Sequence, residues 1–131
     1  DWIGSGSVTA VHASEFSVNH SSGFAGTADA LIDTPLGLTL LDFKTTSREA
    51  DKPEPWLVDY QDQLGAYSLA LQEMSGIKVD AGAIVIAKPD GNVQLRMLSE
   101  LEMRGCECRW SERNDRYQAM VSIGAISEWS E

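Results

Sequence analysis

The chain has 131 residues, the size of one domain, with 43% hydrophobic residues and a formal net charge of -10. No apolar run approaches the roughly 20 residues of a membrane-spanning helix, and Asp1–Ser7 lacks the basic start and apolar stretch of a signal peptide. The acidity argues against a general electrostatic grip on nucleic acid, but it is compatible with solubility alone or with a nucleic-acid enzyme whose acidic residues bind metal.

The first half of the chain predicts three antiparallel strands separated by turns. Segments rich in apolar and β-branched residues alternate there with clusters of Gly, Pro, Asn and Ser. The predicted strands are Ser7–Val18, Phe24–Ile32 and Leu38–Lys44, with turns at Asn19–Gly23 and Asp33–Gly37. A polar loop with two prolines follows, from Thr45 to Pro55.

The second half predicts a crossover helix, two further strands and a C-terminal helix. The predicted elements are a helix over Trp56–Met74, strands over Ala81–Ala87 and Val93–Leu98, and a helix from Ser99 toward Met120. Pro55 suits the first turn of the first helix and Gly76 its end, while Ser99 and Glu102 form a capping-box pattern. The order β-β-β-α-β-β-α predicts an α/β fold with a mixed sheet, whose crossover is right-handed if the third and fourth strands are parallel.

Two aspartates and a lysine are predicted to share one face of the first hairpin. If the hairpin is centred on Pro35–Leu36, residues whose numbers sum to 71 are opposite, so Asp29 faces Asp42. Side chains alternate along a strand, so Asp42 and Lys44 point one way and Phe43 the other. Like charges opposite each other destabilise a sheet unless something offsets them, and a divalent cation is the simplest candidate.

This arrangement suits hydrolysis assisted by a metal ion. Mg²⁺ prefers hard oxygen ligands, which Asp29, Asp42 and the backbone carbonyl of Phe43 could supply. Lys44 would then lie near the attacking water or the scissile phosphate and stabilise developing negative charge. The alternative is a turn-edge aspartate plus a surface Asp–Lys pair worth ~0–1 kcal/mol. The apolar residues that flank Asp42 favour a sheet interior.

The predicted crossover helix carries a second polar group. Gln63 and Tyr67 are four residues apart and share one helix face, and Tyr60 lies on nearly the same face. An amide and a phenol together can bind a phosphate or stack on a base. The alternative is an amphipathic core helix in which Tyr67 packs and Gln63 is simply exposed.

Taken in order, three segments resemble the motifs of the PD-(D/E)XK nuclease superfamily. They are Gly26-Thr-Ala-Asp29, Leu41-Asp-Phe-Lys-Thr45 and Gln63-x-x-x-Tyr67. Within that superfamily they look like the RecB-like exonuclease branch, which includes the mitochondrial genome maintenance exonuclease and its phage and bacterial relatives. The resemblance implies one restriction-endonuclease-like α/β domain over residues 1–131, with a three-stranded antiparallel meander.

The resemblance also implies roles for individual residues. Asp29 and Asp42 would bind Mg²⁺ or Mn²⁺ together with the Phe43 carbonyl, and Lys44 would be the catalytic lysine. The residues implied to arrange the active site or contact DNA are Thr45, Gln63 and Tyr67. Glu15 matches a glutamate found on the first strand in this branch. A functional role and a structural role at the edge of the core are equally favoured for it.

The implied activity is a metal-dependent DNA exonuclease acting in the cell interior on single-stranded or frayed ends. The alternative is an inactive nuclease-like module that binds DNA or acts as a scaffold. Relatives usually carry an upstream helix whose His or Glu completes the metal site, and we expect this chain to begin after that helix. His12 and His20 do not correspond to that residue by position.

The remaining candidates predict structure rather than chemistry. Cys106 and Cys108 are too close on a helix to face each other and too few for a zinc or iron–sulfur site, and they fit a reducing compartment. The tryptophans at 56, 110 and 129 are expected to pack. Arginines at 104, 109, 113 and 116 alternate with acidic residues, which predicts a solvated, salt-bridged helix face.

Overall fold

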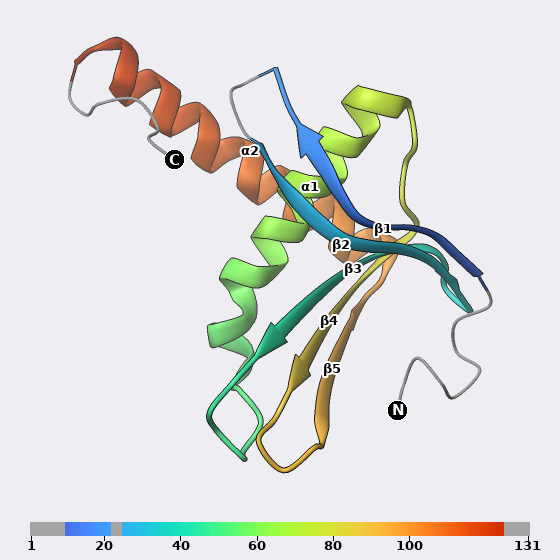
Figure 1. The fold of residues 1–131 in the computed structure, drawn as a ribbon. Coiled ribbons are helices and arrows are strands. Elements are labelled where there is room, and N and C mark those ends of the chain that lie inside the picture. Colours follow the sequence, from blue (N-terminus) through green and yellow to red (C-terminus); the bar gives the residue numbers. More distant parts are fainter. Residues whose placement is uncertain (1–9, 22–24, 125–131) are drawn as a thin grey trace.

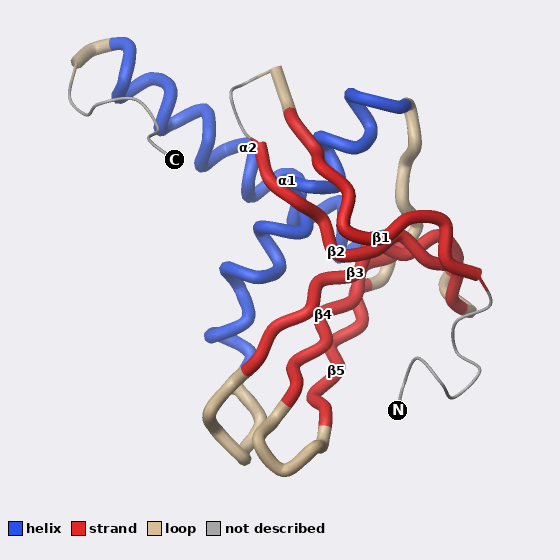
Figure 2. Tube along the Cα trace, viewed as in Figure 1, coloured by secondary structure: helices blue, strands red, loops and turns tan. Residues whose placement is uncertain are grey.

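A computed structural model describes residues 10–21 and 25–124 of the chain. The strands are β1 (Ala10–Asn19), β2 (Ala25–Thr34), β3 (Gly37–Thr45), β4 (Ala81–Ala87) and β5 (Val93–Leu98), and the helices are η2 (Glu54–Leu57), α1 (Val58–Ser75) and α2 (Glu100–Ser122). The five strands form one sheet in the order β1-β2-β3-β4-β5, with both long helices beside it (Figures 1 and 2). The predicted mixed α/β fold is confirmed.

Local sequence signals set several boundaries of these elements. β4 and β5 have the predicted bounds, and Gly76 ends α1 in the left-handed conformation with φ 73°. Ser99 and Glu102 form the capping box at the start of α2. The helix predicted from Trp56 instead begins with the 3₁₀ turn η2, which contains Pro55. Residues 7–9 and Phe24 of the predicted strands lie outside the described residues.

β3 and β4 are the one parallel pair in the described sheet, and α1 connects them. Leu40 and Ile84 lie on the sheet face that α1 and α2 cover, where they join the larger hydrophobic cluster with Leu64. Leu41 and Val85 alternate with them and form a second cluster on the opposite face. The apolar run of β4 is therefore buried on both faces, as its sequence predicts.

The first two strands bend sharply near their middle (Figure 1). Ala28 and Leu31 both pack in the cluster under α1 although they are three residues apart, so β2 does not alternate regularly at Asp29. On β1, Glu15 has a φ of 47°, which is uncommon outside glycine. Its neighbours pair as Ser14–Ala30 and Phe16–Ala28, which places Glu15 opposite Asp29 at the bend.

Three charged residues of α2 have partners on α1. The carboxylate of Asp62 is buried on α1 and pairs with Arg109 at 3.0 Å and Arg113 at 2.9 Å. Ser68 Oγ donates to the buried carboxylate of Glu107 at 2.6 Å. The prediction of a solvated, salt-bridged helix face holds in part. Arg104 and Glu107 pair within α2 at 3.4 Å, and Glu112, Asp115 and Arg116 are exposed, but Arg109, Arg113 and Glu107 also have partners on α1.

In the described residues, neither α1 nor α2 has an apolar stretch that would cross a membrane.

Candidate active site

Asp29 lies where the pairing between β2 and β3 ends. The predicted register is confirmed from Thr34–Gly37 to Ala30–Leu41, but the ladder stops one pair before Asp29 and Asp42. Asp29 Oδ2 instead accepts a hydrogen bond from the backbone N–H of Phe43 at 2.6 Å. Because the N–H and C=O of one strand residue lie at the same strand edge, the Phe43 carbonyl also lies at the edge that faces Asp29.

Asp42, Lys44, Gln63 and Tyr67 form a continuous polar chain between β3 and α1. Lys44 Nζ lies 3.4 Å from Asp42 Oδ2 and donates to Gln63 Oε1 at 3.0 Å. Gln63 Nε2 in turn donates to the Tyr67 hydroxyl at 3.1 Å. Since a lysine ammonium has no acceptor, its contact with Gln63 fixes the amide orientation. These contacts bring together four of the residues that the sequence singles out.

The electrostatics of this group are governed by the burial of Asp42, which is only 5% exposed. Burial raises the pKa of Asp42 to about 6, while Lys44 pulls it down and the nearby Asp29 carboxylate pushes it up. The pKa of the Tyr67 phenol is raised by burial and by the two aspartates. Tyr67 therefore remains a neutral hydrogen-bonding group at physiological pH.

The donor set fits a hard divalent cation in part. Asp42 Oδ2 is buried and, among the described residues, accepts no hydrogen bond, although Lys44 Nζ lies 3.4 Å away as an ion-pair partner. A buried carboxylate oxygen without a hydrogen bond beside a second carboxylate is the chemistry that Mg²⁺ or Mn²⁺ offsets. Within residues 10–21 and 25–124, however, no group of three or more His, Cys, Asp or Glu side chains is close enough to hold a metal ion.

The glycine of the first motif lies against the tyrosine of the third. A Cβ built on Gly26 would lie 2.7 Å from Tyr67 Cε1 and 3.0 Å from its hydroxyl oxygen. Sequence spacing gave no indication of this contact, since the two residues are on β2 and α1. The close approach of the β2 backbone therefore holds the Tyr67 ring beside the carboxylates.

We expect Gly26→Ala to displace the Tyr67 ring and to destabilise the fold by about 1–3 kcal/mol, because a methyl group needs space that the ring occupies. Urea unfolding measures the loss. The double variant Gly26→Ala, Tyr67→Leu provides the control, because removing the phenol should return part of the stability. Equal costs of Gly26→Ala in both backgrounds would contradict the contact.

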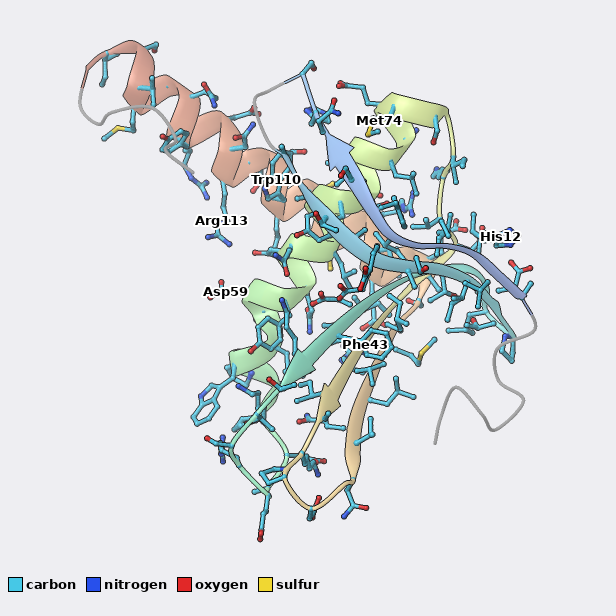
Figure 3. All side chains as sticks on the ribbon, in the orientation of Figure 1. His12, Phe43, Asp59, Met74, Trp110 and Arg113 are labelled. Atoms are coloured by element: carbon cyan, nitrogen blue, oxygen red, sulfur yellow. The ribbon has the colours of Figure 1, made fainter. Side chains whose placement is uncertain are left out.

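Glu15 lies opposite Asp29 and Thr45 follows Lys44, whereas His12 and His20 pair with other carboxylates. Glu15 is exposed on β1, and Thr45 is exposed at the end of β3. His12, on β1, pairs with Asp33 at 3.0 Å. Figure 3 shows its side chain apart from Phe43, which is on β3. His20 pairs with the Glu73 carboxylate at 3.3 Å.

Cys106 is buried and Cys108 exposed, and both thiols are free. Trp129 lies outside the described residues.

One site residue was not anticipated from the sequence. Lys52, in the loop before η2, places its Nζ 3.4 Å from the Tyr60 hydroxyl and 5.6 Å from the ring centroid. Lys44 Nζ lies 5.1 Å from the same ring centroid. The polar loop has no periodicity that could place Lys52, so only the path of the chain shows that it adjoins the lysine of the second motif.

Comparison with solved structures supports the fold. The crystal structure of SSO0001 is similar with a TM-score of 0.50 and 20% identity, and the match covers 80% of this chain and 50% of that chain. A protein from Eubacterium rectale described as a "Putative exonuclease" is similar with a TM-score of 0.58 and 12% identity, covering 92% of this chain and 48% of that chain. This chain thus spans about half the length of either protein.

No curated protein sequence matches the chain at a significant level. A family model described as the PD-(D/E)XK nuclease superfamily matches residues 5–119. That range contains the bend at Asp29, the Asp42–Lys44 segment and the Gln63–Tyr67 pair, and the observed mixed sheet agrees with it. The chain belongs to the PD-(D/E)XK nuclease superfamily.

Proposed function

We propose that this domain is a Mg²⁺- or Mn²⁺-dependent DNA exonuclease that hydrolyses phosphodiester bonds at single-stranded or frayed ends, as in the RecB-like branch. The observation that carries the proposal is the buried Asp42 carboxylate, which lies beside Asp29 and 3.4 Å from Lys44 Nζ. A structural ion pair does not need a second carboxylate at the same place, whereas metal-assisted hydrolysis does.

The metal ligands in this proposal are Asp29, Asp42 and the Phe43 carbonyl. A divalent ion bound there would supply Lewis-acid stabilisation of the phosphate and a lower pKa for a bound water. Asp29 also fixes the β3 backbone by accepting from the Phe43 N–H. The same carboxylate therefore positions the strand that presents Asp42 and Lys44.

Lys44 would stabilise the negative charge that develops on the phosphate oxygens during attack. Its ammonium is held between Asp42 and Gln63, so it needs little reorganisation when the substrate binds. Gln63 positions Lys44 and is itself held by Tyr67. Thr45 follows Lys44 on the exposed end of β3, where it could contact the DNA backbone.

The test is cleavage of end-labelled single-stranded DNA by the full chain with Mg²⁺ or Mn²⁺. We expect Lys44→Ala to lower the cleavage rate at least about 100-fold, since it removes a preorganised charge from the transition state. Lys78→Ala, at an exposed position outside the site, serves as the matched control and should cleave normally. Equal rates for Lys44→Ala and wild type would refute the assigned role.

The alternative is an inactive nuclease-like module that binds DNA or acts as a scaffold. The observation in its favour is that the described residues hold no third metal-binding side chain at the site. Thermal unfolding with Mn²⁺ separates the two, because a ligand at 100 times its Kd stabilises a protein by about 2.7 kcal/mol. A shift that is lost in Asp29→Asn supports the enzyme, and no shift favours the alternative.

A further inference from the structure

The loop between β3 and α1 carries two cations that pair with aromatic rings. The Arg48 guanidinium carbon lies 4.3 Å from the centroid of the Trp56 ring. Lys52 contacts Tyr60 through both its ring and its hydroxyl. In the described part of the chain, neither Arg48 nor Lys52 forms an ion pair with a carboxylate.

Most cations of this protein have carboxylate partners among the described residues. The chain has 20 acidic residues and only 10 Lys and Arg residues, so a surface cation readily finds an acidic neighbour. Lys88, Arg96 and Arg109 all do so. Two cations held on aromatic rings beside the acidic site are available for a polyanion.

Arg48 also has an unsatisfied hydrogen-bond donor. Its Nη1 is buried and has no hydrogen-bond partner among the described residues. A buried guanidinium nitrogen without an acceptor is costly, and an incoming phosphate oxygen is an acceptor that a guanidinium binds well. Arg48 therefore has hydrogen-bonding capacity left for an anionic ligand.

Trp56 offers a stacking surface. It was expected to pack, yet it is 54% exposed, and Arg48 is the partner of its ring in the described residues. Solvent-exposed tryptophan beside arginine is the combination that binds unstacked bases without reading their sequence. The packing prediction for Trp56 was wrong because η2 turns this side chain away from the core.

The loop is held in place by backbone contacts. Gln94 on β5 accepts from the Lys52 N–H at 2.7 Å and donates to the Lys52 carbonyl at 3.0 Å. Thr46 N–H donates to the Ala87 carbonyl at 3.1 Å. A loop fixed at two points loses little conformational entropy when it binds a ligand.

The Tyr60 ring connects this loop to Lys44. The Tyr60 ring contacts both lysines, with Lys44 Nζ 5.1 Å and Lys52 Nζ 5.6 Å from its centroid. We propose that Arg48, Lys52, Trp56 and Tyr60 form a binding track for the single DNA strand that flanks the scissile phosphate. The cations bind backbone phosphates, and Trp56 stacks on a base. This inference rests on the proposed nuclease function.

The test measures binding apart from cleavage. Fluorescence anisotropy of a labelled oligothymidylate is recorded in EDTA with the full chain, at several salt concentrations. We expect Trp56→Ala to weaken binding about 10-fold, as for the loss of one stacked base, and Trp56→Phe to keep most of the affinity. Arg48→Ala should lower the slope of log Kd against log salt by about 0.7, one phosphate contact.

The control is Arg116→Ala, because Arg116 is exposed on α2 and has the same charge. It should change neither the affinity nor the salt slope. With Mg²⁺, Trp56→Ala should raise KM about 10-fold and leave kcat nearly unchanged, which a folding defect would not do.

Two outcomes distinguish the binding track from the proposed nuclease function on which it rests. If the wild type cleaves DNA and Trp56→Ala and Arg48→Ala bind and cleave like the wild type, the track is overturned and the nuclease stands. If neither the wild type nor any variant cleaves DNA, but binding still depends on Trp56 and Arg48, the binding track is supported and the proposed nuclease function is refuted. Tighter binding of blunt duplex than of single strands would also overturn the track.

Discussion

Asp42→Asn should stabilise the metal-free protein at pH 8 while it abolishes metal-dependent cleavage. The loss of activity is expected to be about 1,000-fold or more, since the amide removes a negative metal ligand from the site. The gain in stability has a separate cause. Asp42 is buried, and the cost of keeping it ionised disappears when asparagine replaces it.

The pH dependence of this gain follows from the pKa of Asp42, which is raised from 3.8 to about 6 in the folded protein. Between these values the folded state holds the proton more tightly than the unfolded chain. The unfolding free energy of the wild type therefore falls as pH rises through this window, by about 2–3 kcal/mol in total. Asparagine does not titrate in this range. The variant's gain in unfolding free energy over the wild type is therefore absent below pH 3.8 and complete above pH 6.

Urea unfolding in EDTA at pH 4 and pH 8 measures the difference. Asp115→Asn is the matched control, because Asp115 is exposed on α2 and its replacement should give no pH-dependent gain. If Asp42→Asn were less stable than wild type at pH 8, or if its gain were equal at both pH values, the buried charge would not be the cause. Adding Mn²⁺ should reverse the order of stability, because only the wild type gains from the ion.

Gly65→Ala should destabilise the fold by about 3 kcal/mol. A Cβ at this position of α1 would lie 2.5 Å from the backbone carbon of Cys106 and 2.8 Å from the backbone N of Glu107. Backbone cannot rotate aside as a side chain can, so the two helices would have to separate. That separation would also lengthen the buried hydrogen bond from Ser68 to Glu107.

A second helical glycine gives the control for this prediction. Gly105 lies within α2, and a Cβ there would have only the Arg109 guanidinium within 4 Å, at 3.8 Å. Gly105→Ala should stabilise the protein by up to about 1 kcal/mol through helix propensity alone. Urea unfolding of both variants gives opposite signs if α1 and α2 pack as closely as the structure has them. Two stabilising substitutions would contradict that packing.

The sequence was sufficient where a local signal decides the structure. The continuous apolar run of β4, the glycine that ends α1 and the capping box of α2 each act through residues close in the chain, and all three were confirmed. The hairpin register was also predictable, because a tight turn between two strands fixes which residues face each other.

The site was predictable in part for the same reason. Asp42 and Lys44 share a strand face, and Gln63 and Tyr67 share a helix face, so each pair follows from the period of its element. What joins the pairs is the hydrogen bond from Lys44 to Gln63, which depends on how α1 lies across β3. The order of motifs in the chain pointed to that contact, but no local pattern fixes its geometry.

The sequence by itself thus determined the elements, the register and the two polar faces, since these depend on neighbours within a few residues. Only the tertiary structure decided the bend that places Asp29 on the Phe43 N–H, the pairing of α2 arginines with Asp62, and the exposure of Trp56. The physical reason is that its own strand or helix does not fix which partner a charge or an aromatic ring takes. Its partner is whichever group the packing of distant segments brings within reach.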